Sequence, residues 1–307
     1  MSTVTRKLTF KEYIIVWAKA ARAPFLIVSF LPAVLGGIIA MSDAQFAWWP
    51  FIIAVFGVVM AHSAADFFDD YYDYLSGNLG NKEKQFHDSP LISGEVTLNQ
   101  VLFAAILCFV VGLLCGVYLL FLQPTAVISM TLLGAIAVFF YTAPPLKLNY
   151  RGLGELVLFF AFGPLIVLGI YWVVAGEFSW EAVIAAIAPG VFTMNVGIVS
   201  NIFDHDDDIA SKKYTMPVRF GQANAVKVLA AGIILAYLSI ILGIVFGMLP
   251  VYALLVLLTI PLTYQTVRAS ANFHDLDLYT GAMTKAIATA SLSSVLLIVA
   301  YLLDMWI

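Results

Sequence analysis

Long apolar runs recur through this chain of 307 residues and limit what it can fold into. About nine of them come near the ~20 residues that a helix needs to cross a bilayer. The expected helices are 24–41, 48–65, 98–121, 124–141, 153–175, 180–202, 224–246, 250–268 and 282–303. The composition agrees, because 62% of the residues are hydrophobic and only 11% are charged, whereas a soluble domain is about half apolar and a quarter charged. We therefore expect an all-α integral membrane protein in which residues 1–307 form a single domain around a central cavity.

The 15 lysine and arginine residues divide unevenly between the two ends of these helices. In an arrangement of about nine helices, all of them fall on the side that holds the N-terminus, and one helix more or fewer would scatter them. Because basic loops stay in the cytoplasm, the N-terminal segment 1–23 is expected to be cytoplasmic in a multi-pass protein of the cell membrane. The long polar connections 66–97 and 204–223 lie on the same side and are expected to be the active-site loops.

Two polar clusters with the same spacing close the second and sixth expected helices. The first is Asp66, Asp69 and Asp73, and the second is Asn201, Asp204 and Asp208. Intervals of three and four residues place each set on one face of a helix. If the two helices are neighbours, the oxygen atoms converge on the cytoplasmic side, where they suit Mg²⁺ shared with a substrate phosphate. The alternative is a pair of solvated acidic helix ends, whose like charges repel and sit poorly at helix C-termini.

Other polar side chains near these clusters have weaker patterns. The basic residues Lys212, Lys213 and Arg219 follow the second cluster and are candidates for binding diphosphate oxygens. Asp70 points away from the shared face of a regular helix and is interpreted as solvated or as a supporting residue. His62 is interpreted as a structural histidine within hydrogen-bonding reach of Asp66.

The two clusters and several other segments resemble the sequence motifs of the UbiA superfamily of intramembrane aromatic prenyltransferases. The family's Asn-Asp-x-x-Asp-x-x-x-Asp motif is similar to residues 65–73, with Ala65 in place of the asparagine, and its Asp-x-x-x-Asp motif is similar to residues 204–208. Its Tyr-x-x-Pro-Pro-x-x-Lys segment resembles residues 141–147, and segments 21–37, 152–169 and 212–221 are similar in style.

The resemblance implies Mg²⁺-dependent transfer of an isoprenyl group from a polyprenyl diphosphate, with two Mg²⁺ ions bound by the six residues of the two clusters. It adds Lys147, which would bind phosphate or an acid group of the acceptor, and the weaker candidates Arg22 and Lys19 before the first helix. Ionisation of the donor to an allylic cation needs a dry, aromatic-lined cavity, for which Tyr141, Phe67 and Phe68 are candidates. Arg151 and Glu155 are expected to pair with each other across one helical turn.

The acceptor is left open by these patterns. Segment 150–169 is most similar to the menaquinone branch, which prenylates 1,4-dihydroxy-2-naphthoate with loss of its carboxylate. The pattern Pro90-x-x-Ser93-Gly94 occurs more widely, including in the branches that make archaeal ether lipids from a prenyl-glycerol phosphate, haem O and ubiquinone precursors. A cation transporter is a rival from another class, because carboxylates in membranes also mark ion pathways. The acids at helix ends, away from the bilayer midplane, favour the enzyme, and nothing in the sequence indicates a nucleic-acid partner.

Overall fold

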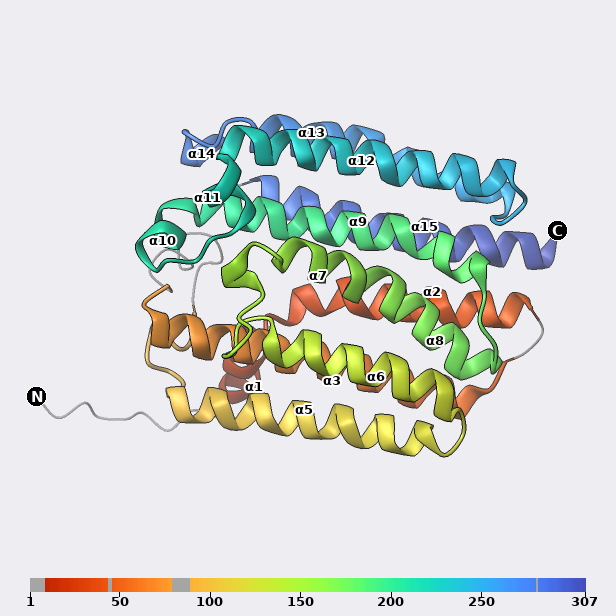
Figure 1. Ribbon diagram of the computed structural model, residues 1–307, viewed down its shortest axis with the longest axis horizontal. Helices are drawn as coiled ribbons and strands as arrows, with labels where there is room; N and C mark the ends of the chain where they lie inside the picture. Colours follow the sequence, from red (N-terminus) through yellow and green to blue (C-terminus); the bar gives the residue numbers. More distant parts are fainter. Residues whose placement is uncertain (1–8, 44–45, 79–88, 280) are drawn as a thin grey trace, which may run out of the picture.

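The computed structural model describes residues 9–43, 46–78, 89–279 and 281–307. Within these residues the secondary structure is helical, without strands (Figure 1). In the described part of the chain, eight helices are long and apolar enough to cross a membrane, and one further apolar helix, α6 (Pro124–Phe140), has 17 residues. At 1.5 Å per residue α6 is about 26 Å long, slightly less than the hydrocarbon core of about 30 Å. The expected all-α membrane fold is confirmed, while the number of crossings and their orientation stay predictions.

The bundle is built from long helices that run nearly parallel or antiparallel to one another (Figure 1). Its elements are η1 (Ala23–Leu26), α2 (Ile27–Ser42), α3 (Trp48–Ser76), α5 (Leu98–Leu120), α6, α7 (Gly154–Phe160), the π-helical turn η3 (Ala161–Leu165), α8 (Ile166–Ala175), α9 (Trp180–Phe203), α12 (Gln222–Val245), the 3₁₀ helix η4 (Val251–Thr259), α13 (Ile260–Ser270) and α15 (Gly281–Trp306). The shorter helices are α1 (Phe10–Ala20), η2 (Asn149–Arg151), α10 (His205–Ala210), α11 (Met216–Phe220) and α14 (Leu276–Tyr279). Helices α10, α11 and α14 gather at one end, on the left of Figure 1.

Helix α3 extends farther than its apolar run. It has 29 residues and is therefore about 43 Å long, more than the bilayer core. It ends at Ser76, and Gly77, with a φ of 75°, provides the left-handed residue that stops it. The expected helix end at residue 65 is wrong, and so is the expectation that residues 66–76 form a loop. The acids of the first cluster lie on the projecting end of a helix, and residues 79–88 lie outside the described residues.

The second cluster lies at a helix interruption. Helix α9 ends at Phe203, Asp204 follows as its capping residue, and α10 begins at His205. The segment 204–223 therefore contains two short helices, α10 and α11, and is not an extended loop. The interruption is short, because the backbone N–H of Asp204 still donates to the carbonyl oxygen of Ser200 at 3.0 Å and that of Asp208 to the carbonyl oxygen of Asp204 at 2.8 Å.

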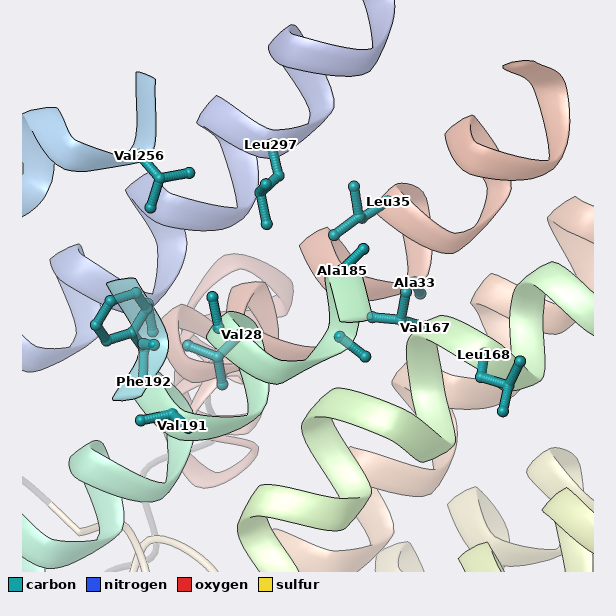
Figure 2. Close-up of a cluster of buried hydrophobic side chains, with 14 of the residues drawn as sticks. Val28, Ala33, Leu35, Val167, Leu168, Ala185, Val191, Phe192, Val256 and Leu297 are labelled. Carbon is teal, nitrogen blue, oxygen red and sulfur yellow. The ribbon is translucent and has the colours of Figure 1, made fainter. Parts of the chain in front are cut away.

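The hydrophobic core lies where α2, α8, α9, η4 and α15 meet, and Figure 2 shows Leu35, Val167, Phe192 and Leu297 among its side chains. Glycine allows the closest approach of α2 to α8, because a Cβ atom on Gly36 would lie 2.3 Å from the carbonyl oxygen of Val167. Small residues at such crossings are how helices pack closely in a bilayer, where apolar burial itself provides little driving force. This packing holds α2, α8 and α9 around the cavity described next.

Candidate active site

A cavity of about 320 Å³ opens between α2, α3, α5, α6, α8 and α9. Its polar lining residues are Arg22, His62, Asp66, Asp69, Thr131, Tyr141, Asn149, Thr193, Ser200, Asn201, Asp204 and Lys213. All of these except Thr131 and Thr193 lie at the end of the bundle that carries α10 and α11, and the rest of the wall is mostly apolar. Along α3 the lining runs from Asp69 to Ala54, about 22 Å at 1.5 Å per residue. The cavity therefore combines a charged end with a long apolar interior.

Two acids of the first cluster line this cavity, and the third does not. Asp66 and Asp69 are among the lining residues. Asp73 has an exposed fraction of 0% and accepts hydrogen bonds from the hydroxyl of Tyr150 at 2.8 Å and from Nζ of Lys213 at 3.1 Å. The spacing correctly placed the three acids at one end of a helix. Asp73, however, binds the segments that carry Tyr150 and Lys213 to α3. Its role as a metal ligand stays a prediction.

The second cluster divides in the same way. Asn201 and Asp204 line the cavity, and the hydroxyl of Ser200 donates to Asp204 at 3.4 Å. Asp208 is fully buried and accepts from the amide of Asn78 at 3.0 Å and the hydroxyl of Thr215 at 2.8 Å. Burial raises the pKa of Asp208, and the nearby charge of Asp73 raises it further, against the opposing effects of Lys213 and these hydrogen bonds.

Asp70 supports a residue of the cavity wall. It is buried and forms an ion pair with Arg22, whose Nη2 also lies 3.6 Å from Oδ2 of Asp69. Burial lowers the pKa of Arg22, but the attraction of Asp70, Asp66 and Asp69 outweighs it, so the net shift is upward. The structure agrees with the supporting role expected for Asp70 and not with the solvated one, because Arg22 lies in the turn before η1 and reaches this helix end. Arg22 itself lines the cavity, as a substrate-binding residue would.

The other predicted basic residues occupy different environments. Lys213 lines the cavity with an exposed fraction of 4%, and the attraction of Asp73, Asp69 and Asp208 raises its pKa despite the opposing effect of burial. Lys147 is partly buried, and its Nζ lies 4.9 Å from the centroid of the Tyr150 ring. Lys147 and three exposed basic residues are not among the lining residues, so their binding roles stay predictions. The three exposed residues are Lys19, Lys212 and Arg219.

Aromatic side chains reach the cavity from unexpected positions. Tyr141 is among the lining residues, as predicted. Phe68 and Phe67 are not, because α3 turns them into a second hydrophobic cluster, where Phe68 packs edge-on against Phe139. The other aromatic rings of the wall are Phe25, Phe109 and Phe162. The sequence held no signal for them, since each sits in an apolar run rich in phenylalanine.

Two further polar residues of the wall were missed or given a lesser role. Asn149 lines the cavity and follows the Pro-Pro turn, where a polar residue before a helix is a weak signal. His62 also lines the cavity, and its Nε2 lies 3.7 Å from Oδ2 of Asp66 while Nδ1 lies 2.8 Å from the hydroxyl of Ser29. Ala65, where the resemblance places asparagine, is part of the wall as well.

The expected pairing of Arg151 with Glu155 is wrong. Arg151 donates to the carbonyl oxygen of Pro145 at 3.0 Å. Glu155 points into the protein and accepts from Nδ2 of Asn201 at 2.9 Å. Glu155 lies in the first turn of α7, which packs against α9. The hydrogen bond to Asn201 on α9 therefore forms in place of the expected pair with Arg151.

The oxygen donors of this wall fit Mg²⁺ in chemical type. Carboxylates of Asp66, Asp69 and Asp204 and the amide of Asn201 reach one cavity from two helices. Among the described residues, no three acidic, histidine or cysteine side chains are close enough to form a complete metal centre. Mg²⁺ takes few protein ligands and completes its shell with water and substrate phosphates, so the set suits an ion that arrives with a diphosphate.

The sequence matches the model of the UbiA prenyltransferase family over residues 29–278. It is 26% identical to 2-carboxy-1,4-naphthoquinone phytyltransferase of Synechocystis, over 84% of this chain and 83% of that protein. It is 24% identical to 1,4-dihydroxy-2-naphthoate octaprenyltransferase of Bacillus subtilis, over 83% of this chain and 81% of that protein. The two relatives share a naphthalene-type acceptor and differ in the prenyl group that they are named for.

Solved structures show the same fold. A UbiA homologue from Aeropyrum pernix superposes with a TM-score of 0.69 at 18% identity, over 91% of this chain and 98% of that one. A UbiA homologue from Archaeoglobus fulgidus, bound to DMAPP and Mg²⁺, superposes with a TM-score of 0.59 at 14% identity, over 95% of this chain and 99% of that one.

Proposed function

Because the chain belongs to the UbiA prenyltransferase family, we propose that it transfers a polyprenyl group from its diphosphate to 1,4-dihydroxy-2-naphthoate or a close relative of it, with Mg²⁺. The observation that carries this proposal is the shape and polarity of the cavity. One end presents carboxylates with Arg22 and Lys213, and the remainder is apolar over about 22 Å of α3. A polyprenyl diphosphate has the same division between a charged head and a long apolar tail.

In the proposed reaction Asp66, Asp69, Asn201 and Asp204 hold the metal, and Lys213 binds diphosphate oxygens. Bound Mg²⁺ supplies positive charge that stabilises the leaving diphosphate. The apolar wall excludes water from the allylic cation, which water would otherwise capture. The negative faces of aromatic rings such as Phe162 stabilise that cation. The aromatic ring of the acceptor then attacks this cation, and 1,4-dihydroxy-2-naphthoate loses its carboxylate as CO₂ when the new carbon–carbon bond replaces it.

The proposal of a naphthoate-type acceptor is supported by the names of the relatives and by the similarity of segment 150–169 to the menaquinone branch. We further propose that the N-terminus and the polar end of the cavity face the cytoplasm. All described lysines and arginines lie at or near the bundle end that carries α10 and α11, and the described connections at the other end contain none. Residues 1–307 form one domain in this proposal.

The test incubates the purified full chain with geranyl or geranylgeranyl diphosphate, Mg²⁺ and a panel of acceptors. We expect a prenylated product from 1,4-dihydroxy-2-naphthoate that disappears when EDTA removes the metal. Product only from a prenyl-glycerol phosphate would instead assign the chain to ether-lipid synthesis. The enzyme proposal fails if no acceptor gives product and diphosphate binding does not depend on Mg²⁺, and cation flux in sealed vesicles would then favour a transporter.

The deep part of the cavity should set the length of the accepted prenyl tail. Gly169 lines it, and a Cβ atom there would meet Met130 at 3.5 Å, an ordinary contact, so a larger side chain fills the space without striking the backbone. We expect Gly169→Leu to lower kcat/KM for an octaprenyl donor at least about tenfold relative to a geranyl donor, since excluding even small apolar groups is worth about 1–3 kcal/mol. Steady-state kinetics with both donors measure the ratio.

The matched control is Ala231→Leu, which adds the same side chain on an exposed face of α12. It should leave the ratio unchanged. An equal loss for both donors in Gly169→Leu would show that the tail does not occupy this part of the cavity.

A further inference from the structure

Glu155 is a buried carboxylate directly behind the candidate metal site. Its exposed fraction is 2%, and it does not line the cavity. Its Oε1 accepts hydrogen bonds from Nδ2 of Asn201 at 2.9 Å and from the backbone N–H of Met216 at 3.2 Å. Asn201 is also buried, at 6%, but it does line the cavity. Glu155 therefore contacts the site only through a residue of its wall.

The chemistry of a carboxylate determines which way the Asn201 amide faces. An ionised carboxylate only accepts hydrogen bonds, so the NH₂ group of the amide must point toward Glu155. The amide carbonyl Oδ1 is then the end left for the cavity, where an oxygen atom suits a hard cation. With a glutamine at position 155 this constraint is lost, because a second amide can donate or accept. Either orientation of Asn201 would then form a hydrogen bond.

Packing alone does not explain a carboxylate at this position. Its second oxygen, Oε2, is buried and has no hydrogen-bond partner among the described residues. An unsatisfied buried acceptor is destabilising, and an apolar side chain of the same size would avoid that cost. The same carboxylate also holds the backbone of Met216, close to Lys213 and Thr215 in the segment that returns to the cavity.

Building on the proposed function, we propose that Glu155 is a positioning residue that turns the Asn201 carbonyl oxygen toward the metal and diphosphate. It acts like the outer partners of metal ligands, whose loss commonly costs about 10–100-fold in metal affinity. Its effect passes through Asn201, so it should disappear when Asn201 is removed.

The experiment measures equilibrium binding of Mn²⁺, used as the probe for Mg²⁺, in the presence of inorganic pyrophosphate. Free Mn²⁺ is followed by electron paramagnetic resonance with the purified full chain. We expect Glu155→Gln, which preserves size, to raise the apparent Kd at least about tenfold while the melting temperature changes little. Glu155→Met should weaken binding at least as much. The control Glu177→Gln, exposed beyond the far end of α8, should bind like the wild type.

A double-mutant cycle separates positioning from stability. In an Asn201→Ala background, Glu155→Gln should cause no further change in Kd, because the residue it acts through is gone. The proposal is overturned if Glu155→Gln and Glu155→Met bind Mn²⁺ like the wild type, or if the loss persists in full without Asn201. Failure of the wild type to bind Mn²⁺ with pyrophosphate would overturn the proposed function itself, and this inference with it.

Discussion

Replacing Asp69 or Asp204 by alanine should lower kcat/KM by at least about 100-fold while the protein still inserts and folds. Both carboxylates line the cavity, from α3 and from the end of α9. Each is proposed to hold Mg²⁺ against the diphosphate. Loss of this charge stabilisation raises the activation free energy of the reaction, and a factor of 100 in rate corresponds to about 2.7 kcal/mol. Steady-state kinetics with saturating Mg²⁺ measure the effect.

Folding should survive these changes because Lys213, which Asp69 also attracts, keeps its ion pair with Asp73. Arg22 keeps its ion pair with Asp70 when Asp69 is removed, and Asp204 has a weak contact with Ser200 in its own helix. The matched control is Asp206→Ala, two residues from Asp204, whose carboxylate is 96% exposed. It should keep near-normal activity. Near-normal turnover of Asp69→Ala or Asp204→Ala would show that the metal assignment is wrong.

The apolar runs of the sequence predicted the membrane-spanning helices well, and they failed where a helix leaves the bilayer. The end of an apolar run indicates where a helix leaves the hydrocarbon core of the bilayer. It does not indicate where the backbone hydrogen bonds of the helix end. Helix α3 therefore continues through the charged residues 66–76 until Gly77 stops it. The short helix α1 was missed for a related reason, since its apolar residues cover only part of its surface and it spans 11 residues.

The spacing of the acids located the site but did not determine which of them face the cavity. That depends on partners far away in the chain. Asp73 is held by Tyr150 and Lys213, and Asp208 by Asn78 and Thr215, none of which a helical repeat can predict. The same holds for Glu155, which was expected to pair with Arg151 one turn away and instead accepts a hydrogen bond from Asn201 on another helix. Tertiary contacts decide these cases.

These contacts divide the acids at this end of the bundle by function. Asp66, Asp69 and Asp204 face the cavity, while Asp73, Asp208 and Glu155 hold the segment around Lys213, Thr215 and Met216 in place. The segment carries the lysine that is proposed to bind diphosphate, so its position matters to the site. Loss of a cavity acid should therefore reduce activity first, and loss of a fastening contact should reduce stability first.

Lys213→Met should accordingly destabilise the protein by about 3–5 kcal/mol, the usual cost of removing one partner of a buried ion pair. Asp73 has an exposed fraction of 0%, and the change removes a positive charge that lies 3.1 Å from its carboxylate. Burial and the charge of Asp73 raise the pKa of Tyr150, so this phenol stays neutral and cannot balance the charge. Thermal unfolding in detergent, compared with the wild type, measures the loss.

The double variant Lys213→Met with Asp73→Asn should recover most of that stability, because the uncompensated buried charge is then gone and the asparagine oxygen still accepts from Tyr150. Activity should not recover, since the diphosphate would still lack its lysine. The matched control is Lys212→Met, which replaces a neighbouring, exposed lysine and should unfold at the wild-type temperature.

If Lys213→Met alone were as stable as the wild type, or the double variant no more stable than the single, the ion pair would not be what holds this segment against α3. Recovery of stability without activity is the outcome that assigns Lys213 both roles, as a structural partner of Asp73 and as a binding residue of the cavity.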